Sequence, residues 1–445
     1  MLGEGMKKSG LFFLKNIPLF IVLCFVFNFP REAKAQFANG ADIGWLSQME
    51  SSGYVFYNDS GVRKNCMEIL KEEGINALRF RVWVNPVGGW CGKKDVATMA
   101  HRADSMGFGV MIDFHYSDTW ADPGHQTKPA AWAGHTVAQL LTDIYNHTYD
   151  VLDTLKSIGV IPTWVQVGNE TNTGMLWPEG KATTSMKNFA DMVNSGYDAI
   201  KAIDSSILVI VQLSDGYNNG MYRWMFDGLR NNGARWDVIG MSQYPFWANL
   251  PWDTDNSQCY SNMLDMISRY DTKVMICEAG MHYDQAVTCR TFLLDLIAKT
   301  KSVGGLGVFY WEPECYNWQN YKLGAWDPVT KKPTVAMDAF LGIDDTSSTS
   351  VKEDAPGIQG QRNDSDGVSV YPNPVGSGRN FMISLKDITG PTSIRIFTVN
   401  GQKLFETTAA NNDNITIGNL RLIPGIYFVQ LTNKHQKITK TLIVK

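Results

Sequence analysis

The chain lacks several features that would indicate common classes of function. Its seven cysteines include no C-x-x-C pair, which argues against a zinc knuckle. It has no excess of positive charge, because 40 Lys and Arg oppose 44 Asp and Glu, and the formal net charge is −4. It also has no internal repeat. A mildly acidic chain is a poor ligand for nucleic acid or anionic lipid. We therefore expect no nucleic-acid partner, whereas a neutral polysaccharide remains open.

Long apolar runs are also scarce and are confined to the N-terminus. An apolar stretch from Leu11 to Phe29 follows two lysines. Its unbroken part, Leu19 to Phe27, is too short to cross a bilayer, and Ala33-Lys34-Ala35 then has the spacing of a signal-peptidase site. We predict that residues 1–35 are a signal peptide and that no transmembrane segment remains after cleavage; a retained anchor is the alternative. Cleavage removes five Lys/Arg and two Glu, so the net charge becomes −7.

Export would place the remaining six cysteines in an oxidising compartment, where disulfides form. Cys66 and Cys91 flank the same predicted strand, and we predict that they pair. Cys277 lies inside an apolar run beside Glu278, so we expect it to be buried and reduced.

Between Gly40 and Leu341, short runs of Val, Ile, Phe and Met alternate with helical patterns such as 62–73 and 139–157. Continuous apolar runs are typical of parallel strands that are buried on both faces. Eight runs are predicted as strands: Ala41–Trp45, Ile75–Val82, Gly109–His115, Thr163–Gly168, Leu208–Leu213, Asp237–Gln243, Lys273–Cys277 and Gly304–Trp311. Eight strand–helix units in this order predict the α/β class and a (β/α)8 barrel, or TIM barrel.

The composition changes after Gly342. Residues 343–367 are rich in Ser, Thr, Asp, Gly and Pro, which predicts a linker. From 368 to 445, short alternating strands are separated by turn residues, and Asn400-Gly401 predicts a hairpin turn. We therefore predict four parts: a signal peptide at 1–35, a barrel at 36–342, a linker at 343–367 and a small all-β sandwich at 368–445.

Two glutamates follow apolar strands of the predicted barrel. Glu170 ends the fourth unit after Asn169, and Glu278 ends the seventh. Catalytic groups of such barrels lie where strands end, at the C-terminal face. A retaining glycosidase needs two facing carboxyl groups, one to give a proton and one to attack the anomeric carbon. A single glutamate after a strand would be a solvated loop residue more often than not, but two such glutamates favour a glycosidase.

Arg79, Arg81 and Trp83 share one face of the second strand because side chains alternate along a strand. A charged side chain that points into the barrel needs a partner. An arginine near Glu278 would lower the pKa of that carboxyl group and keep it ionised. We expect Arg81 in this role, and Arg79 is the better candidate for a side chain that points outward.

Aromatic and polar residues follow the third, sixth and eighth strands. Residues 115–123 combine His, Tyr, Trp and Asp in one loop. The hydroxyl of Tyr244 could orient Glu278, and Trp311 offers a flat apolar face to a sugar ring. Several of the 14 tryptophans lie near strand ends, which favours a cleft that binds a sugar chain.

These segments resemble glycoside hydrolase family 53, the endo-β-1,4-galactanases, over residues 40–341. The resemblance rests on Gly40-Ala41-Asp42-Ile43, Arg-x-Arg-Val-Trp-Val-Asn-Pro at 79–86, His-Tyr-Ser-Asp-Thr-Trp-Ala-Asp-Pro at 115–123, Gln166-Val167-Gly168-Asn169-Glu170, Gly174-Met175-Leu176-Trp177-Pro178 and Tyr244-Pro245-Phe246-Trp247. The chain departs from the family pattern at Gln243 and at residues 278–283.

The resemblance implies a (β/α)8 fold and hydrolysis of β-1,4-galactan or type I arabinogalactan with retention. It implies Glu170 as acid/base and Glu278 as nucleophile, with no required cofactor. Some bacterial relatives hold a structural calcium ion near the seventh and eighth strands, but no clear Asp/Asn/His cluster there supports one in this chain. The residues expected to bind substrate are Asp42, Arg81, Asn85, His115, Asp118, Trp120, Asp122, Asn169, Asp215, Tyr244, Trp247 and Trp311.

The C-terminal part resembles the sorting domains of Bacteroidetes secreted proteins, on the basis of residues 370–374, 425–429 and 440–445. The resemblance implies a secreted protein or one attached to the cell surface or outer membrane, and we expect a monomer. Two other functions stay open: a retaining barrel hydrolase for another β-1,4-glycan, and a surface protein that binds glycans without cleaving them. The motifs at 79–86 and 115–123 disfavour the first, and the presence of both glutamates disfavours the second.

Overall fold

The computed structural model describes residues 37–342 and the strands of the C-terminal part, which comprise 368–371, 375, 381–385, 390–398, 402–409, 415–417, 422, 425–434 and 437–444. The predicted signal peptide, the linker and the Asn400-Gly401 turn lie outside these residues. The chain divides into two compact units between Ser348 and Thr349.

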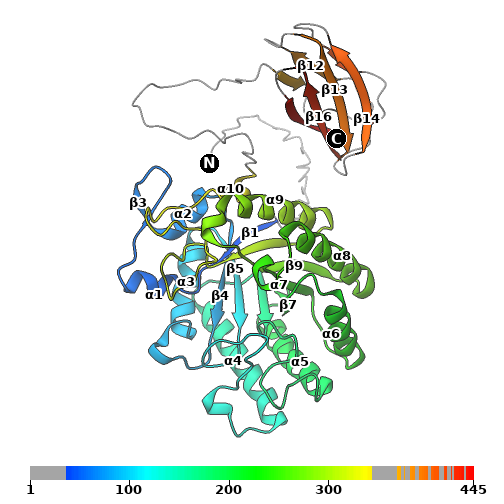
Figure 1. Cartoon of the computed structure of the whole chain (residues 1–445). Coiled ribbons are helices and arrows are strands. Elements are labelled where there is room, and N and C mark those ends of the chain that lie inside the picture. Colours follow the sequence, from blue (N-terminus) through cyan, green and yellow to red (C-terminus); the bar gives the residue numbers. More distant parts are fainter. Residues whose placement is uncertain are drawn as a thin grey trace, which may run out of the picture. The chain divides into compact units, whose positions relative to one another are not determined.

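The first unit is a closed barrel of eight parallel strands surrounded by helices (Figure 1). Neighbouring strands follow the order β1-β10-β9-β8-β7-β6-β5-β4 around the barrel. The strands are β1 (Ala38–Asp42), β4 (Ala77–Val82), β5 (Gly109–Phe114), β6 (Trp164–Val167), β7 (Leu208–Leu213), β8 (Val238–Gln243), β9 (Lys273–Ala279) and β10 (Gly307–Trp311). The predicted fold is confirmed, although β1 begins three residues before the predicted run.

Helices follow the barrel strands in sequence, and further short elements decorate the loops. The helices are α1 (Leu46–Ser51), α2 (Cys66–Glu72), α3 (Lys93–Ser105), α4 (Val137–Ser157), α5 (Met186–Ile203), α6 (Asn219–Asn231), α7 (Pro245–Ala248), α8 (Trp252–Tyr270), α9 (Ala286–Ser302) and α10 (Asp338–Leu341). The strands β2 (Phe56–Tyr57) and β3 (Arg63–Lys64) form a small hairpin, and three single turns of 3-10 helix lie at Val87–Gly89, Ala130–Trp132 and Tyr283–Gln285.

The local sequence explains where helices begin. Thr136 and Gln139 cap α4 reciprocally, each side chain accepting from the other residue's backbone N–H. Ser185 caps α5 in a similar way, by accepting from the N–H of Asn188. These caps satisfy backbone donors that the first turn of a helix leaves free.

The barrel interior has an apolar floor below a polar layer. The floor is a cluster of inward side chains that includes Met111, Trp164 and Phe309. Gly40 completes it, because a Cβ at this position would lie 2.3 Å from the ring of Phe309. Towards the C-terminal ends of the strands the inward residues are charged or amides, and the chemistry of the barrel is therefore confined to that end.

The second unit has two antiparallel sheets. One contains β11 (Val368–Tyr371), β12 (Phe381–Leu385) and β15 (Ile415–Ile417); the other contains β14 (Lys403–Ala409), β13 (Thr392–Thr398), β16 (Gly425–Thr432) and β17 (Lys437–Val444). Side chains from both sheets, such as Ile383 and Val429, share one hydrophobic core. The predicted all-β C-terminal domain is confirmed, and it holds a core of its own.

The predicted disulfide between Cys66 and Cys91 is wrong. Both thiols are buried and free, as are those of the other four cysteines between 37 and 342. The Cys91 thiol donates to the carbonyl of Gly44 at 3.3 Å, while Cys66 begins α2. Burial raises the pKa of Cys91 to about 11. Cys277 is buried and reduced, as predicted. Among the described residues, no helix is long and apolar enough to cross a membrane.

Candidate active site

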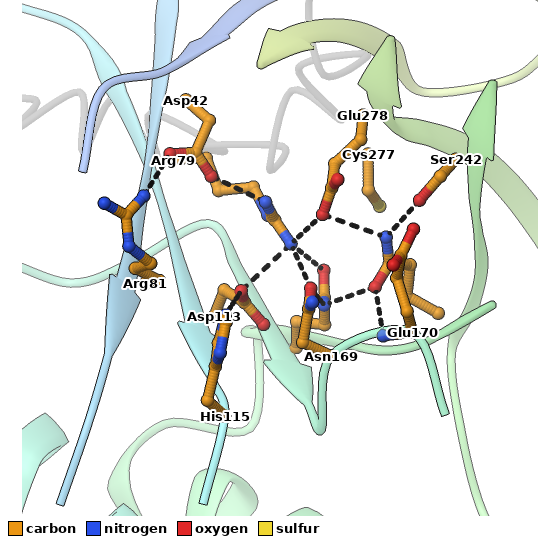
Figure 2. A network of polar contacts seen from close by, with 12 residues as sticks. Asp42, Arg79, Arg81, Asp113, His115, Asn169, Glu170, Ser242, Cys277 and Glu278 are labelled. Atoms are coloured by element: carbon orange, nitrogen blue, oxygen red, sulfur yellow. Dashed lines mark hydrogen bonds and ion pairs between the residues drawn. The ribbon is translucent and has the colours of Figure 1, made fainter. Parts of the chain in front are cut away.

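The two glutamates lie at the C-terminal mouth of the barrel. Glu278 is the sixth residue of β9, and Glu170 follows β6 with a left-handed backbone, φ 43°. Both line a cleft of about 520 Å³. The left-handed turn at Glu170 is rare for a residue with a side chain, and such strain is concentrated at functional sites. Figure 2 shows both residues in one network of polar contacts, which Glu278 joins through its carboxylate and Glu170 through its backbone N–H.

Glu278 is held by one cation and two hydrogen-bond donors from three different segments of the barrel. Arg79 Nη2 lies 2.9 Å from Oε1, and Gln212 Nε2 donates to the same oxygen at 3.2 Å. The hydroxyl of Tyr244 donates to Oε2 at 3.1 Å, which is the contact predicted from the sequence. The carboxylate is therefore fixed in position by groups that favour its charged form.

The expectation for the two arginines is wrong, because Arg79 and not Arg81 contacts Glu278. Arg79 is 1% exposed, so it does not point outward. Its Nη1 donates to Asp42 at 2.6 Å, and its Nη2 lies 3.0 Å from Asp113 and 2.9 Å from the side-chain oxygen of Asn169 (Figure 2). One buried guanidinium thus balances three carboxylates from β1, β5 and β9.

Arg81 also points inward, but towards β10 and the aromatic side chains. Its Nη1 forms an ion pair with Glu312 and lies 3.6 Å from Asp42. The guanidinium lies 4.4 Å from the ring centre of Trp120. Glu312 has a strained, left-handed backbone with φ 48°. Burial raises its pKa to about 7. Arg81 therefore supports the wall of the cleft rather than Glu278.

The environments of the two glutamates differ in a way that separates their pKa values. Burial raises the pKa of Glu170 well above its ordinary value, and the neighbouring charge of Glu278 raises it further. Burial also raises the pKa of Glu278, but Arg79 and Tyr244 act in the opposite direction. Glu170 is thus the carboxyl group that keeps its proton as the pH rises, and Glu278 ionises first.

The tautomer of His115 follows from its neighbours. Nδ1 faces two N–H donors, the indole of Trp83 at 3.2 Å and the backbone of Ala121 at 3.0 Å, so it carries no proton. The proton of the ring is therefore on Nε2, which lies 2.9 Å from Asp113. The chain Trp83–His115–Asp113 fixes the third loop against Arg79, which in turn contacts Glu278.

Eight of the twelve predicted substrate-binding residues line the cleft: His115, Trp120, Asp122, Asn169, Asp215, Tyr244, Trp247 and Trp311. The other four do not. Asp42 and Arg81 are buried: Asp42 pairs with Arg79, Arg81 pairs with Glu312, and the two lie 3.6 Å apart. Asp118 accepts from the backbone N–H groups of Asn85 and Ala130, so Asp118 and Asn85 hold the shape of a loop.

The cleft has an aromatic wall that the sequence only partly revealed. Trp45 packs edge-on against Trp311 with ring centres 5.0 Å apart, and Tyr321 lies 4.8 Å from Trp311. Trp45 and Tyr321 were not predicted, nor were Ser214 and Tyr217, which also line the cleft. Trp247 stands at the rim and is 65% exposed. Trp45 ends the first predicted run, and its position at a strand end was the available signal.

The part of the chain that the structure describes offers no set of metal ligands. Among the described residues, no group of three or more His, Cys, Asp or Glu is arranged to hold a metal ion. The carboxylates that cluster beside the cleft are neutralised by Arg79 and Arg81 instead.

An eight-stranded barrel with two unlike glutamates at the ends of its fourth and seventh strands, in a cleft walled by aromatic rings, defines a glycoside hydrolase of the TIM-barrel class. The chain belongs to glycosyl hydrolase family 53, whose model matches residues 38–337. Sequence relatives agree with this assignment. An arabinogalactan endo-β-1,4-galactanase from Cellvibrio japonicus is 32% identical over 66% of this chain and 84% of its own length. An endo-β-1,4-galactanase from Bacillus subtilis is 30% identical over 68% of this chain and 74% of its own.

Solved structures give the same picture. The family 53 catalytic domain from Ignisphaera aggregans has a TM-score of 0.63 and 29% identity, covering 70% of this chain and 97% of that one. A fungal β-1,4-galactanase has a TM-score of 0.64 and 28% identity, covering 68% and 98%. Residues 369–445 match the secretion system C-terminal sorting domain, which indicates secretion or delivery to the cell surface.

Proposed function

We propose that this enzyme cleaves internal β-1,4-galactosidic bonds of β-1,4-galactan and type I arabinogalactan, with retention of configuration. The relatives named as endo-β-1,4-galactanases support this substrate. The observation that carries the mechanism is the pair Glu170 and Glu278 in one cleft: burial raises the pKa of both, but Arg79 and Tyr244 lower that of Glu278 while the charge of Glu278 raises that of Glu170. No observation favours another β-1,4-glycan or a binding protein without activity.

In the first step, Glu278 attacks and Glu170 protonates. A lone pair of the Glu278 carboxylate forms a bond to the anomeric carbon while the bond from that carbon to the glycosidic oxygen breaks. The leaving oxygen takes the proton of Glu170, so the departing chain leaves as a neutral alcohol. The raised pKa of Glu170 is what keeps this proton available near neutral pH.

In the second step, the roles reverse at Glu170. Its carboxylate, now deprotonated, removes a proton from a water molecule that attacks the anomeric carbon, and Glu278 leaves as a carboxylate. Two inversions give net retention. The pKa of Glu170 suits both steps because the negative charge on Glu278 is absent in the covalent intermediate, which lowers the pKa of Glu170 when it must act as a base.

Sugar rings would stack on the aromatic wall formed by Trp45, Trp120 and Trp311, with Trp247 at the rim. Asn169, Asp122 and Asp215 supply polar groups at the same cleft. His115, with its proton on Nε2, positions the loop at residues 115–123 and does not transfer a proton. Asp42, Arg81, Asn85 and Asp118 support the site from outside the cleft.

The proposed domain organisation is a signal peptide at 1–35, the catalytic barrel at 36–342, a linker at 343–367 and a sorting domain at 368–445. The division between Ser348 and Thr349 and the two family matches are consistent with it. In this proposal the enzyme acts as a monomer on polysaccharide outside the cell.

Hydrolysis by the purified enzyme on a panel of β-1,4-galactan, type I arabinogalactan, xylan, mannan and glucan tests the substrate. We expect oligosaccharide release from the two galactans and none from the others. Equal or greater release from xylan, mannan or glucan would overturn the substrate assignment. The Glu278→Ala variant is the control for a contaminating hydrolase.

A further inference from the structure

Gln212 lies on β7, 0% exposed, between the two glutamates. Its Oε1 accepts from the backbone N–H of Glu170 at 2.8 Å. Its Nε2 donates to Oε1 of Glu278 at 3.2 Å and to the hydroxyl oxygen of Ser242 at 2.7 Å. The amide orientation is fixed, because an N–H can only donate and a carboxylate can only accept. One amide therefore links the backbone of Glu170 to the carboxylate of Glu278.

The same amide closes a ring of hydrogen bonds. Arg79 donates to Oε1 of Gln166 at 3.2 Å, and Gln166 donates to Oε1 of Gln212 at 2.8 Å. Gln212 donates to Glu278, and Arg79 contacts the same Glu278 oxygen. Along the path from Arg79 through Gln166 and Gln212 to Glu278 every hydrogen bond points the same way, so each bond strengthens the next.

The barrel makes room for this side chain. Gly240 on β8 is the register partner of Gln212. A Cβ at position 240 would lie 2.9 Å from the Cβ of Gln212 and 2.8 Å from the thiol of Cys277. A larger residue at 240 would push Gln212 or Cys277 out of place, so the glycine and the glutamine fit together.

We propose that Gln212 is a positioning residue for the double displacement: it holds the left-handed turn that presents Glu170 and occupies Oε1 of Glu278, so that Oε2 is the attacking oxygen. This inference rests on the proposed function of the two glutamates. Oε1 of Glu278 lies 2.9 Å from Nη2 of Arg79 in an ion pair and accepts a hydrogen bond from Nε2 of Gln212, so two protein groups already face it. Among the residues that the structure describes, the hydroxyl of Tyr244 alone donates to Oε2, which keeps a lone pair for the anomeric carbon.

The second link runs through Ser242. Its oxygen accepts from Gln212, so its own proton is free to donate to the carboxyl group of Glu170, a bond that lowers the pKa of that group. Other charged groups also face the pair. Arg79, Asp42 and Asp113 act on Glu278, and Asp215 acts on Glu170. These groups are unchanged in the variants below, so pH shifts can be assigned to position 212.

The test compares Gln212→Leu and Gln212→Glu with wild type on whichever polysaccharide the wild-type enzyme cleaves, across the pH range. Loss of one hydrogen bond to a charged group lowers a rate by about 10- to 100-fold. For Gln212→Leu we expect a fall in kcat of this size with KM little changed, because the side chain does not line the cleft. Glu278 loses a donor and its pKa rises, so the acid limb of kcat moves to higher pH.

Gln212→Glu has the same shape and separates this role from a packing role. Below its own pKa the introduced carboxyl group still donates, so kcat at acid pH should exceed that of the leucine variant. When this carboxyl group ionises, it places a negative charge beside Glu278. As the pH rises, the rate of the Gln212→Glu variant should therefore begin to fall at a lower pH than that of wild type. Gln243→Leu is the matched control, since Gln243 is equally buried at the end of β8 but acts on Asp255 rather than on either glutamate. We expect its pH limbs to be unchanged.

Melting temperatures and the fraction of competent sites correct each rate for loss of folded enzyme. If both Gln212 variants lose activity with neither pH limb displaced, or if Gln212→Leu behaves as Gln243→Leu does, the positioning role is overturned. This result is separable from a failure of the proposed function. If the proposed substrate is wrong, the polysaccharide used in the assay changes, but the comparison of the variants with wild type does not. If the proposed nucleophile is wrong, the Glu278→Ala variant will still hydrolyse the substrate.

Discussion

Nη2 of Arg79 lies 2.9 Å from Oε1 of Glu278, deep in a barrel where neither side chain is more than 8% exposed. The guanidinium also contacts Asp42 and Asp113, so removing it would leave Asp113 and Glu278 without this cation and Asp42 with Arg81 alone. Arg79 therefore decides how easily Glu278 ionises.

For Arg79→Gln we expect a loss of kcat/KM and an acid limb displaced to higher pH by about 1–3 pH units, because the pKa of Glu278 is no longer held down by the cation. Arg81→Gln is the control. It removes the partner of buried Glu312, so it should lower the melting temperature and leave the acid limb in place. Equal displacement of the limb by both variants would contradict the assignment of Arg79.

Glu170→Gln cannot donate a proton to the leaving oxygen. We expect hydrolysis of galactan to be lost, while an aryl galactoside with a good leaving group should still form the covalent intermediate, because it needs little protonation. The alkaline limb of that glycosylation step should disappear in the variant, since Glu170 is the group that loses its proton there. Equal losses on both substrates with an unchanged pH profile would rule out Glu170 as the acid.

Glu73, which follows α2, is buried, and burial raises its pKa to about 8. The folded state thus binds this proton more tightly than the unfolded chain does. Its contribution to stability is complete below the unfolded pKa near 4.5 and is lost as the pH rises through about 8. Between these two values the free energy of unfolding should fall by up to about 1.4 kcal/mol for each rise of one in pH. Glu73→Gln should flatten this fall, as measured by urea titration, whereas Glu68→Gln, at an exposed site on the same helix, should not.

The features that the sequence predicted correctly are those that depend on neighbouring residues along the chain. The bounds of β7 were predicted to the residue, because burial of an apolar run is a local property. Glu278 was placed after its strand, yet it belongs to β9, since a charged residue inside a barrel strand looks like a strand end.

The partners across the barrel were beyond reach of the sequence. Alternation along β4 shows that residues 79 and 81 share a face, but not which of them meets β9 and which meets β10. Gln212 carries no signal at all, because its role depends on Glu170 and Glu278 approaching from two other strands. The disulfide between Cys66 and Cys91 was inferred from the compartment and from their positions on either side of one predicted strand; neither fixes the distance between the thiols, and both are free.

The C-terminal unit has its own core of two sheets, separate from the core of the barrel. A chain that ends after Gly342 should therefore keep the kcat and the unfolding transition of the barrel, while losing delivery to the cell surface. Steady-state kinetics and calorimetry of the two proteins check this. A large fall in kcat on soluble galactan would show that the second unit contributes to the cleft.

The central claim is that Glu278 forms the covalent bond to the sugar. The direct measurement is peptide mass mapping after incubation with a 2-deoxy-2-fluoro galactosyl fluoride, whose slow second step lets the covalent intermediate accumulate. We predict one equivalent of fluorosugar on the peptide that contains Glu278, and none in the Glu278→Ala variant. A label on any other residue, or unchanged labelling in that variant, would contradict the account.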